Sequence, residues 1–560
     1  MKYISKYFLG LSLMLAAGFS SCTGDLDVPP KDPNQDTPEK LFKNDPRGTM
    51  DRMLAECYQG LATAGYKGAG ESILGFGDAG AGTFTRTIFN LEELTTDHFS
   101  WLQFSDAGYY ELVTMAFAPD NEVMYAAYSR IYGEIALCNE FIRTIQQYRG
   151  YLADGDQAAA DDGIRQAKIL RSLAYFYAIS DFGSAGYVDE TSEAGAAPVQ
   201  YSRADLYNKV VSTLEEVSAE YGDSYVAPAY GYVGKEAADA LLARFYLNAG
   251  VFTGTPAYDK CWNICQKIIA HHQGAGFNNS GLADSYKALF GANNEQYAAQ
   301  GSRVNEILLT VPQDGINLQA YGGSTFYIAA CCGSADGISS LNDCNLNAQW
   351  TCMVAREQFS NQFGFDANGY TNDARAELWK TSKDGFEIGN STIMGNGGYA
   401  KGYAPLKYTN YAYDEFGNID TENSPNGSER SFADADWTVI RLAEIYLNAV
   451  EANVVGNVGN QADALKYINY IRERAGVEAW GVASLTADNI LAERSRELYG
   501  ENIRRTDLVR FGKYAGGGYV WNWKGGIHDG RDVDAHYNLY PIPSKVISFQ
   551  NYEQNPGYGK

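Results

Sequence analysis

The sequence predicts a mainly α-helical protein in which tetratricopeptide-like helix-turn-helix repeats form a scaffold that a large loop-rich insertion interrupts. Two segments, 242–249 and 442–449, agree at six of eight positions, and 173–178 is a weaker copy of them. Small alanines beside large tyrosines and leucines at positions i, i+3 and i+4 let neighbouring helices approach closely and interlock. Between residues 275 and 430 this pattern gives way to Gly, Asn, Ser and Tyr. Three or more such helix pairs can stack into one scaffold.

Helical spacing of apolar residues predicts the scaffold element by element. The period is clear over 38–65 and again over 120–148. The glycine-rich stretch 67–85 predicts a loop, and the Asp/Ala/Gly stretch 150–163 predicts an exposed excursion between helices. Each copy of the repeat is followed by a partner helix, at 204–221, 257–271 and 461–475 in turn.

The insertion is expected to carry the binding surface. It contains only short apolar runs such as 307–311, and a sustained helical period occurs only near 353–363. Binding residues usually lie on irregular segments that a rigid scaffold holds in place. We therefore predict a single domain over 38–560, with the helical scaffold at about 38–274 and 431–560 and the insertion at about 275–430.

Composition excludes several classes of partner. The chain has 560 residues, of which 45% are hydrophobic and 20% charged, as in a folded protein with a large core. Its formal net charge of −24 repels a phosphate backbone, so nucleic acid is not expected as a partner. The 42 tyrosines combine a flat apolar face with a hydrogen-bonding tip, which suits the apolar faces and hydroxyl rims of sugars.

The N-terminus has the pattern of a lipoprotein signal peptide. Lys2 and Lys6 precede an apolar run over 8–19, which is too short to span a bilayer, and Ser20-Ser21-Cys22 follows. Small residues directly before a cysteine resemble a bacterial lipobox. We expect residues 1–21 to be removed, Cys22 to carry the lipid, and residues 22–37 to form an extended tether. An ordinary secretory signal with an incidental cysteine is the alternative.

The remaining cysteines and the histidines predict no metal centre. No zinc-type Cys/His spacing is present, and the five histidines are scattered along the chain. In an exported chain, disulfides within 331–352 are as compatible with the sequence as buried thiols at Cys331, Cys332, Cys344 and Cys352. Four carboxylates could hold calcium but lack the EF-hand order, and a solvated acidic loop is the alternative for Asp154, Asp156, Asp161 and Asp162.

Six stretches in order carry a resemblance to a known family. The first is Cys22 followed by Leu26-Asp27, and another is the helix 166–176 with Asp181-Phe182-Gly183. The others lie at 234–238, 468–476 with 493–498 and 507–512, 539–543 and 554–558. Over nearly its full length the chain resembles the SusD/RagB family of nutrient-binding outer-membrane lipoproteins, which implies a SusD-like fold.

The resemblance implies a binder and not an enzyme. It implies a cell-surface lipoprotein of the outer membrane that captures oligosaccharide and passes it to a SusC-like TonB-dependent transporter. It implies no cofactor, and the sequence shows no metalloprotease, esterase or phosphate-binding motif. Two alternatives stay open: a lipoprotein that captures peptides or proteins, and a secreted glycosidase, whose paired carboxylates follow no sequence spacing.

The resemblance together with side-chain chemistry suggests the sugar contacts. The segment 86–101 resembles an early loop in which relatives place a stacking aromatic, so we expect Trp101 to present a ring face to solvent. Arg86 and Asp97 would then bond sugar hydroxyls. The insertion offers further aromatic faces beside small polar residues, at Tyr321, Phe326, Tyr327 and Trp350. The alternative for each aromatic is a place in the core, because large aromatics are mostly buried.

Overall fold

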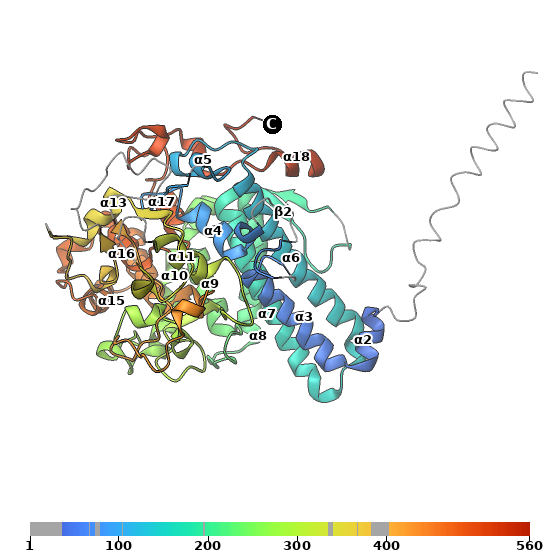
Figure 1. Ribbon diagram of the computed structural model, residues 1–560. Coiled ribbons are helices and arrows are strands. Elements are labelled where there is room, and N and C mark those ends of the chain that lie inside the picture. The colour runs from blue at the N-terminus through green and yellow to red at the C-terminus, as the bar shows by residue number, and fades with distance from the viewer. Residues whose placement is uncertain are drawn as a thin grey trace, which may run out of the picture.

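The computed structural model describes residues 36–65, 68–72, 79–103, 105–193, 197–333, 340–366, 368–381 and 403–559 (Figure 1). The signal sequence, Cys22 and most of the tether lie outside these ranges. Within them, no helix is both long and apolar enough to cross a membrane.

Helices make up most of the described structure, which confirms the predicted mainly α class. The N-terminal part contains α2 (Pro38–Asn44), α3 (Pro46–Ala62), α4 (Phe84–Glu92), α5 (Tyr109–Thr114), α6 (Glu122–Tyr148), α7 (Gln157–Tyr177), α8 (Arg203–Glu220), α9 (Lys235–Thr253) and α10 (Tyr258–His272). The middle part contains α11 (Gly323–Cys331), α12 (Leu341–Cys344) and α13 (Glu357–Ser360). The C-terminal part contains α14 (Leu442–Gly456), α15 (Gln461–Arg474), α16 (Ala487–Leu498), α17 (Arg504–Arg510) and α18 (Ser544–Gln550).

The strands form short antiparallel pairs. The pairs are β1 (Phe99–Trp101) with β5 (Met353–Ala355), β2 (Ala185–Tyr187) with β3 (Val199–Tyr201), β4 (Ile307–Val311) with β8 (Trp437–Arg441), and β6 (Lys380–Thr381) with β7 (Tyr403–Ala404). Two of them, β1–β5 and β4–β8, join a strand of the middle part to a strand outside it. They therefore bind the middle part to the helices on either side.

The repeated sequence segments lie on packed helix pairs, as predicted. The copies fall on α7, α9 and α14, whose partners in the chain are α8, α10 and α15. α10 also packs against α14, which continues the stack across the insertion. Ala243 and Ala443 are fully buried, and the thiol of Cys261 on α10 approaches the carbonyl oxygen of Ala243 to 3.5 Å. The small side chains permit this close helix contact.

Three local predictions were wrong. Residues 157–163 form the first turns of α7, so the loop covers only the residues before them. Alanine has a high helix propensity, and Arg149 holds both Gln157 (2.7 Å) and Asp161 (2.6 Å) at this end of the helix. The second error is α11, which forms from residues with weak helix propensity because all nine of its residues are buried. The third is the helical period near 353–363, where the chain instead forms β5 and only four residues of α13.

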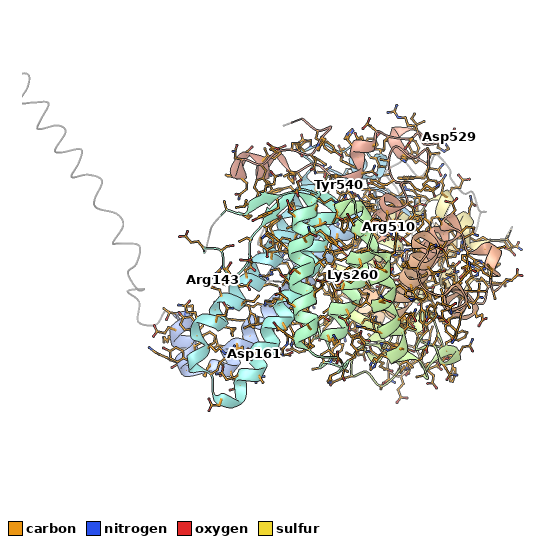
Figure 2. All side chains as sticks on the ribbon, turned by 180° about the vertical axis from the view of Figure 1, so that it is seen from behind. Arg143, Asp161, Lys260, Arg510, Asp529 and Tyr540 are labelled. Carbon is orange, nitrogen blue, oxygen red and sulfur yellow. The ribbon has the colours of Figure 1, made fainter. Side chains whose placement is uncertain are left out.

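An arm of α2, α3, α6 and α7 projects from the body of the molecule, and Arg143 and Asp161 mark it in Figure 2. The aspartates considered as calcium ligands lie here. Arginines pair with three of them, Arg47 with Asp156 (3.1 Å), Arg149 with Asp161 (2.6 Å) and Arg165 with Asp162 (3.4 Å). Over the described ranges these carboxylates do not converge on a common point, so the calcium hypothesis gains no support.

The eight described cysteines are all buried free thiols. The described structure therefore has no disulfide within 331–352, and burial raises the pKa of the Cys331 and Cys352 thiols well above its usual value. The thiol of Cys344 donates to the carbonyl oxygen of Ser340 (3.4 Å). The cysteines of this region act as small apolar side chains in the core.

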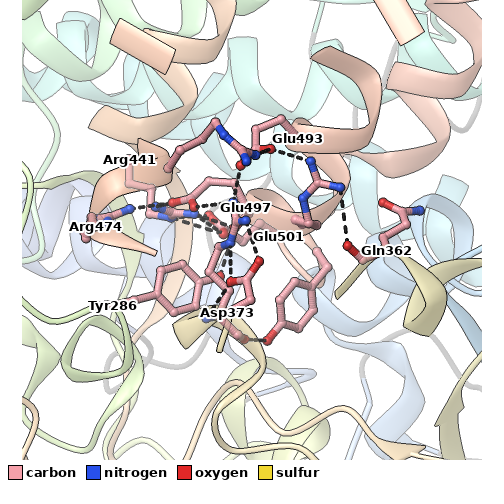
Figure 3. A network of polar contacts seen from close by, with 12 residues as sticks. Tyr286, Gln362, Asp373, Arg441, Arg474, Glu493, Glu497 and Glu501 are labelled. Atoms are coloured by element: carbon pink, nitrogen blue, oxygen red, sulfur yellow. Dashed lines mark hydrogen bonds and ion pairs between the residues drawn. The ribbon is translucent and has the colours of Figure 1, made fainter. Parts of the chain in front are cut away.

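A buried network of charged side chains joins the insertion to the C-terminal helices (Figure 3). Arg441, at the end of β8, contacts Glu497 (2.7 Å), Glu501 (2.9 Å) and Glu306 (3.1 Å). Arg474 contacts Glu306 (2.7 Å) and Glu497 (2.5 Å). No side chain of this group is more than 4% exposed, so water cannot solvate these charges. The opposite charges must therefore stabilise one another.

The network extends further into the insertion. Arg375 contacts Asp373 and Glu493, each at 2.6 Å, and Lys407 contacts Glu501 at 2.6 Å. Burial alone would raise the pKa of Glu493, but the charges of Arg375 and neighbouring arginines lower it to about 2. Glu497 follows the same logic, since burial opposes ionisation and Arg474, Arg441 and Arg375 together lower its pKa to about 2.

We expect Glu497→Gln to destabilise the protein by ~3–5 kcal/mol, because it leaves buried arginines without a compensating charge. The free energy of unfolding in urea at pH 7 measures this effect. Glu216→Gln on the exposed side of α8 is the control and should change stability by less than ~0.5 kcal/mol. Equal stability of the two variants would contradict a structural role for the network.

The same network predicts how stability depends on pH. The folded-state pKa of Glu497 and of Glu493, about 2, lies below the value near ~4.3 of an unfolded chain. Their contribution is therefore complete above pH ~5 and is lost as the pH falls toward 2. Urea unfolding between pH 7 and pH 3 should show this loss, with a shallower slope in Glu497→Gln.

Candidate functional site

Three half-buried aromatic side chains come together beside α11. The ring centroid of Tyr321 lies 6.0 Å from that of Trp350 and 5.0 Å from that of Phe432. The planes of the Trp350 and Phe432 rings are inclined to that of Tyr321 by 49° and 47°, so neither ring is stacked flat on it. We call this group the aromatic face. Rings of this kind can stack on the C–H side of a flat ligand while leaving its polar rim free.

The turn before α11 places Tyr321. Gly322 and Gly323 follow it, and a side chain on Gly322 would collide with the Thr83 hydroxyl at 2.1 Å. Gly323 has φ +53° and its N–H donates to the Thr85 hydroxyl (2.8 Å). Glycine is required here because the chain passes directly over the start of α4 in a left-handed conformation. α4 and α11 consequently lie side by side (Figure 1).

The other end of α11 places Trp350. Its backbone N–H donates to the carbonyl oxygen of Ala329 (2.7 Å), and the backbone N–H of Cys352 donates to the carbonyl oxygen of Ala330 (3.0 Å). The chain then enters β5, where Met353 pairs with Trp101 of β1. The aromatic side chain is therefore presented by backbone that two elements hold.

A third connection along α11 places Phe432. The N–H of the next residue, Ala433, donates to the hydroxyl of Thr325 on α11 (2.8 Å). The N–H of Asn347 donates to the carbonyl oxygen of Arg430 (2.8 Å), which joins the chain near Trp350 to the chain near Phe432. Asn347 is exposed, so its amide offers hydrogen bonds close to this junction.

A buried layer of aromatic rings supports the aromatic face. Phe326 on α11 lies 6.3 Å from Trp350 and 5.9 Å from Trp101, whose ring stacks on Tyr109 at 4.8 Å. The guanidinium of Arg86 lies over the Phe326 ring (4.8 Å) and the Trp350 ring (5.6 Å). A cation over the ring face fixes the Trp350 ring and is favoured where water is scarce.

The expectation that Trp101 presents its ring to solvent was wrong. Trp101 is 1% exposed, and its indole N–H donates to Asp106 (3.1 Å). Phe326 and Tyr327 are fully buried as well, and the Tyr327 hydroxyl donates to the carbonyl oxygen of Pro405 (2.8 Å). These three aromatics therefore belong to the core. Trp101 and Tyr327 bond their polar groups inside the protein, and Phe326 has no polar group.

Asp97 also belongs to the interior. Its two carboxylate oxygens accept from Arg504 at 2.7 Å each, and one accepts from the Tyr519 hydroxyl at 2.7 Å. Burial opposes its ionisation, but the charge of Arg504 lowers the pKa well below the usual range. Arg86 is 5% exposed and acts on the aromatic face from below. Of the predicted site residues, the structure brings only Tyr321 and Trp350 together at the surface.

Phe432 was missed by the sequence analysis. It lies outside the predicted insertion, and the segment around it has neither a repeat nor a motif. Only its position near α11 places it beside Tyr321. Apart from the aromatic face, an aromatic hollow of about 500 Å³ lies between α6 and α18, with Tyr125, Tyr132 and Phe549 in its wall. In this hollow the Tyr132 hydroxyl already donates its hydrogen bond to the Gly186 carbonyl oxygen (2.7 Å), so this proton is not free for a polar ligand.

Helix pairs that stack around a buried core, with a loop-rich insertion between them, define a helical-repeat protein. The model of the SusD family matches residues 356–558. The starch-binding protein SusD of Bacteroides thetaiotaomicron is 30% identical over 597 aligned positions, which cover 100% of this chain and 99% of that protein. The chain belongs to the SusD family.

Solved structures show the same fold. A SusD superfamily protein from Bacteroides vulgatus superposes with a TM-score of 0.65 at 20% identity, covering 92% of this chain and 99% of that one. A structure described as a laminarin binding SusD-like protein gives 0.65 at 19% identity and covers 91% and 99%. Surface glycan-binding protein A from Bacteroides thetaiotaomicron gives 0.63 at 18% identity, with the same coverage.

Trp101→Ala should destabilise the protein by ~3–5 kcal/mol, because it empties a site between two stacked rings in the core. Thermal or urea unfolding measures the change. Tyr370→Ala, at a side chain that is 74% exposed, is the matched control and should alter stability by less than ~0.5 kcal/mol. An unchanged stability of Trp101→Ala would contradict a place for this side chain in the core.

Proposed function

We propose that this protein is a cell-surface glycan-binding lipoprotein that captures oligosaccharide for import through a SusC-like TonB-dependent transporter. The observation that carries the proposal is the aromatic face of Tyr321, Trp350 and Phe432, held on both ends of a fully buried helix. A sugar stacks on such rings through its C–H face and bonds polar groups at the rim. Relatives described as starch-binding, glycan-binding and laminarin-binding support this choice of ligand.

The charge of the molecule favours neutral glycans. A formal net charge of −24 opposes sulfated or uronic-acid polysaccharides at long range, whereas uncharged hexose chains meet no such barrier. The cation at the aromatic face, Arg86, is nearly buried and is engaged with the rings of Phe326 and Trp350. We therefore expect neutral glucans, of the starch or laminarin type, to bind before charged polymers do.

In this proposal the protein binds its ligand without cleaving it. The relatives it resembles are described as binding proteins. Incubation with a bound glucan, followed by chromatography of the sugars, should show no shorter products. Release of oligosaccharides by the purified protein would contradict this part of the proposal and favour the glycosidase alternative.

Substitution of the aromatic face tests the site. Trp350→Ala and Tyr321→Ala should each weaken binding of maltooligosaccharide or laminarin by roughly tenfold or more, since central aromatic anchors contribute most of the binding energy. Calorimetric titration of the chain lacking residues 1–22 measures the affinity, and unfolding curves confirm that each variant is folded. Both side chains are partly exposed, so the loss of affinity should exceed the loss of stability.

Phe549→Ala is the matched control, because Phe549 is an aromatic side chain that is 86% exposed in the hollow between α6 and α18. It should bind glucan normally. Normal affinity of Trp350→Ala and Tyr321→Ala together with loss in Phe549→Ala would move the site to the hollow beside α18. Binding of peptides but of no glycan would favour the peptide-capturing alternative.

The anchor is tested at Cys22, which lies outside the described residues. Cys22→Ser should abolish labelling by radioactive fatty acid and release the protein from the membrane fraction, because acyl chains rather than a helix would hold it there. Cys57→Ser, at a buried thiol of the folded body, should keep the label. Retention of label and membrane association in Cys22→Ser would show that the protein is anchored in another way.

A further inference from the structure

Three side chains that can ligate a metal ion meet where the end of α10 lies against the start of α9. Glu236 is in the first turn of α9, and His271 and His272 are in the last turn of α10. α9 and α10 form an antiparallel hairpin, so these two helix ends are neighbours. Ligand atoms of the three residues all lie within 4.8 Å of one another, and no other group of this kind was found in the described ranges.

Two of the three ligands are already held in place. The Glu236 carboxylate and a ring nitrogen of His272 form a hydrogen bond, and their side chains are only 11% and 7% exposed. The amide N–H of Asn305 reaches the other Glu236 oxygen at 3.5 Å. The Oδ1 atom of this same asparagine is buried and accepts no hydrogen bond. A buried amide oxygen without a donor is costly, and it shows that the polar groups beside Glu236 are not fully satisfied.

The third ligand faces solvent and leaves the position accessible. His271 is exposed, and its ring packs against the ring of His272 at 5.0 Å and that of Tyr225 at 5.2 Å. Its side chain also borders a cavity of about 690 Å³. A metal ion could therefore enter from water and replace the direct contact between Glu236 and His272.

The lysine beside Glu236 does not oppose a cation strongly. Lys235 is paired with Asp239 (3.5 Å), and its ammonium donates to the Ser218 hydroxyl (2.9 Å) and carbonyl oxygen (3.0 Å). Lys267 and Asp223 also border the cavity and carry opposite charges. The local charge is thus nearly balanced before the Glu236 carboxylate is counted.

The donor set identifies the class of metal. Two imidazole nitrogens and one carboxylate oxygen are the ligands that Zn²⁺ takes, with a fourth position left for water. Calcium and magnesium prefer ligand sets made only of oxygen. The negative end of the α10 dipole attracts cationic side chains, which could explain one protonated histidine in its last turn. It does not explain why two imidazoles converge with a carboxylate from another helix.

We propose that Glu236, His271 and His272 bind one divalent transition-metal ion of the zinc class, which clamps the open end of the α9–α10 hairpin. The ion would replace the hydrogen bond between Glu236 and His272 by metal–ligand bonds from both helices. This proposal is independent of the glycan site, since none of its residues belongs to the aromatic face.

Titration with zinc tests the proposal on the complete chain, without a histidine tag and after removal of metal by a chelator. We expect one Zn²⁺ per chain by calorimetry and a rise in the melting temperature of about 2 °C or more at saturating zinc. His271→Ala should lower the zinc affinity by about tenfold or more and abolish the rise. Its metal-free melting temperature should stay unchanged, because the His271 side chain is exposed.

His528→Ala is the matched control, because this histidine is also partly exposed and also contacts a carboxylate, that of Asp529 (2.6 Å), without a second imidazole. It should bind zinc as the parent does. Co²⁺ provides a second readout, since its visible absorption reports nitrogen and oxygen ligands; the bands should appear in the parent and be absent in His271→Ala. The proposal is overturned by the absence of stoichiometric binding, by equal zinc affinity of His271→Ala and the parent, or by equal loss in His528→Ala.

Discussion

The buried ion pairs around Arg441 are the constraint on which the remaining structure depends. A charged side chain without solvent needs an opposite charge close by, and Arg441 finds Glu497 and Glu501 on the C-terminal side and Glu306 on the side of the insertion. Moving the insertion away from the helices would separate Glu306 from Arg441 and break the pairing of these charges. The network thus sets where β4 and β8 lie, and with them the ends of the segment that carries α11. A loop-rich segment acquires a defined position in this way.

The aromatic face uses that position. α11 is buried on every side, so it acts as a rigid support, and the face consists of residues at its start, at its end and along its length. Trp101 and Phe326 underneath fill the space between this support and the N-terminal helices. A ligand that stacked on this face would meet rings that are already held in place, so less conformational entropy would be lost on binding.

The proposed glycan face and the proposed metal position illustrate two uses of one scaffold. Stacked helix pairs leave their ends at the surface, and the ends of antiparallel neighbours bring together residues that the chain separates, as with Glu236 and His272. The insertion adds the irregular backbone on which an aromatic face can be built. The formal net charge of −24 would oppose anionic ligands of the proposed glycan face.

Local pattern in the sequence determined the class of fold, because helical period and the repeat at 242–249 and 442–449 reflect neighbours three and four residues apart. Side-chain chemistry named Tyr321 and Trp350 as candidate contacts but could not separate them from Trp101, since the exposure of a ring depends on what packs above it. Helix α11, the burial of Asp97 against Arg504 and the place of Phe432 were decided only by tertiary structure. Burial and charge pairing join residues hundreds of positions apart, and no local period records which of them will meet.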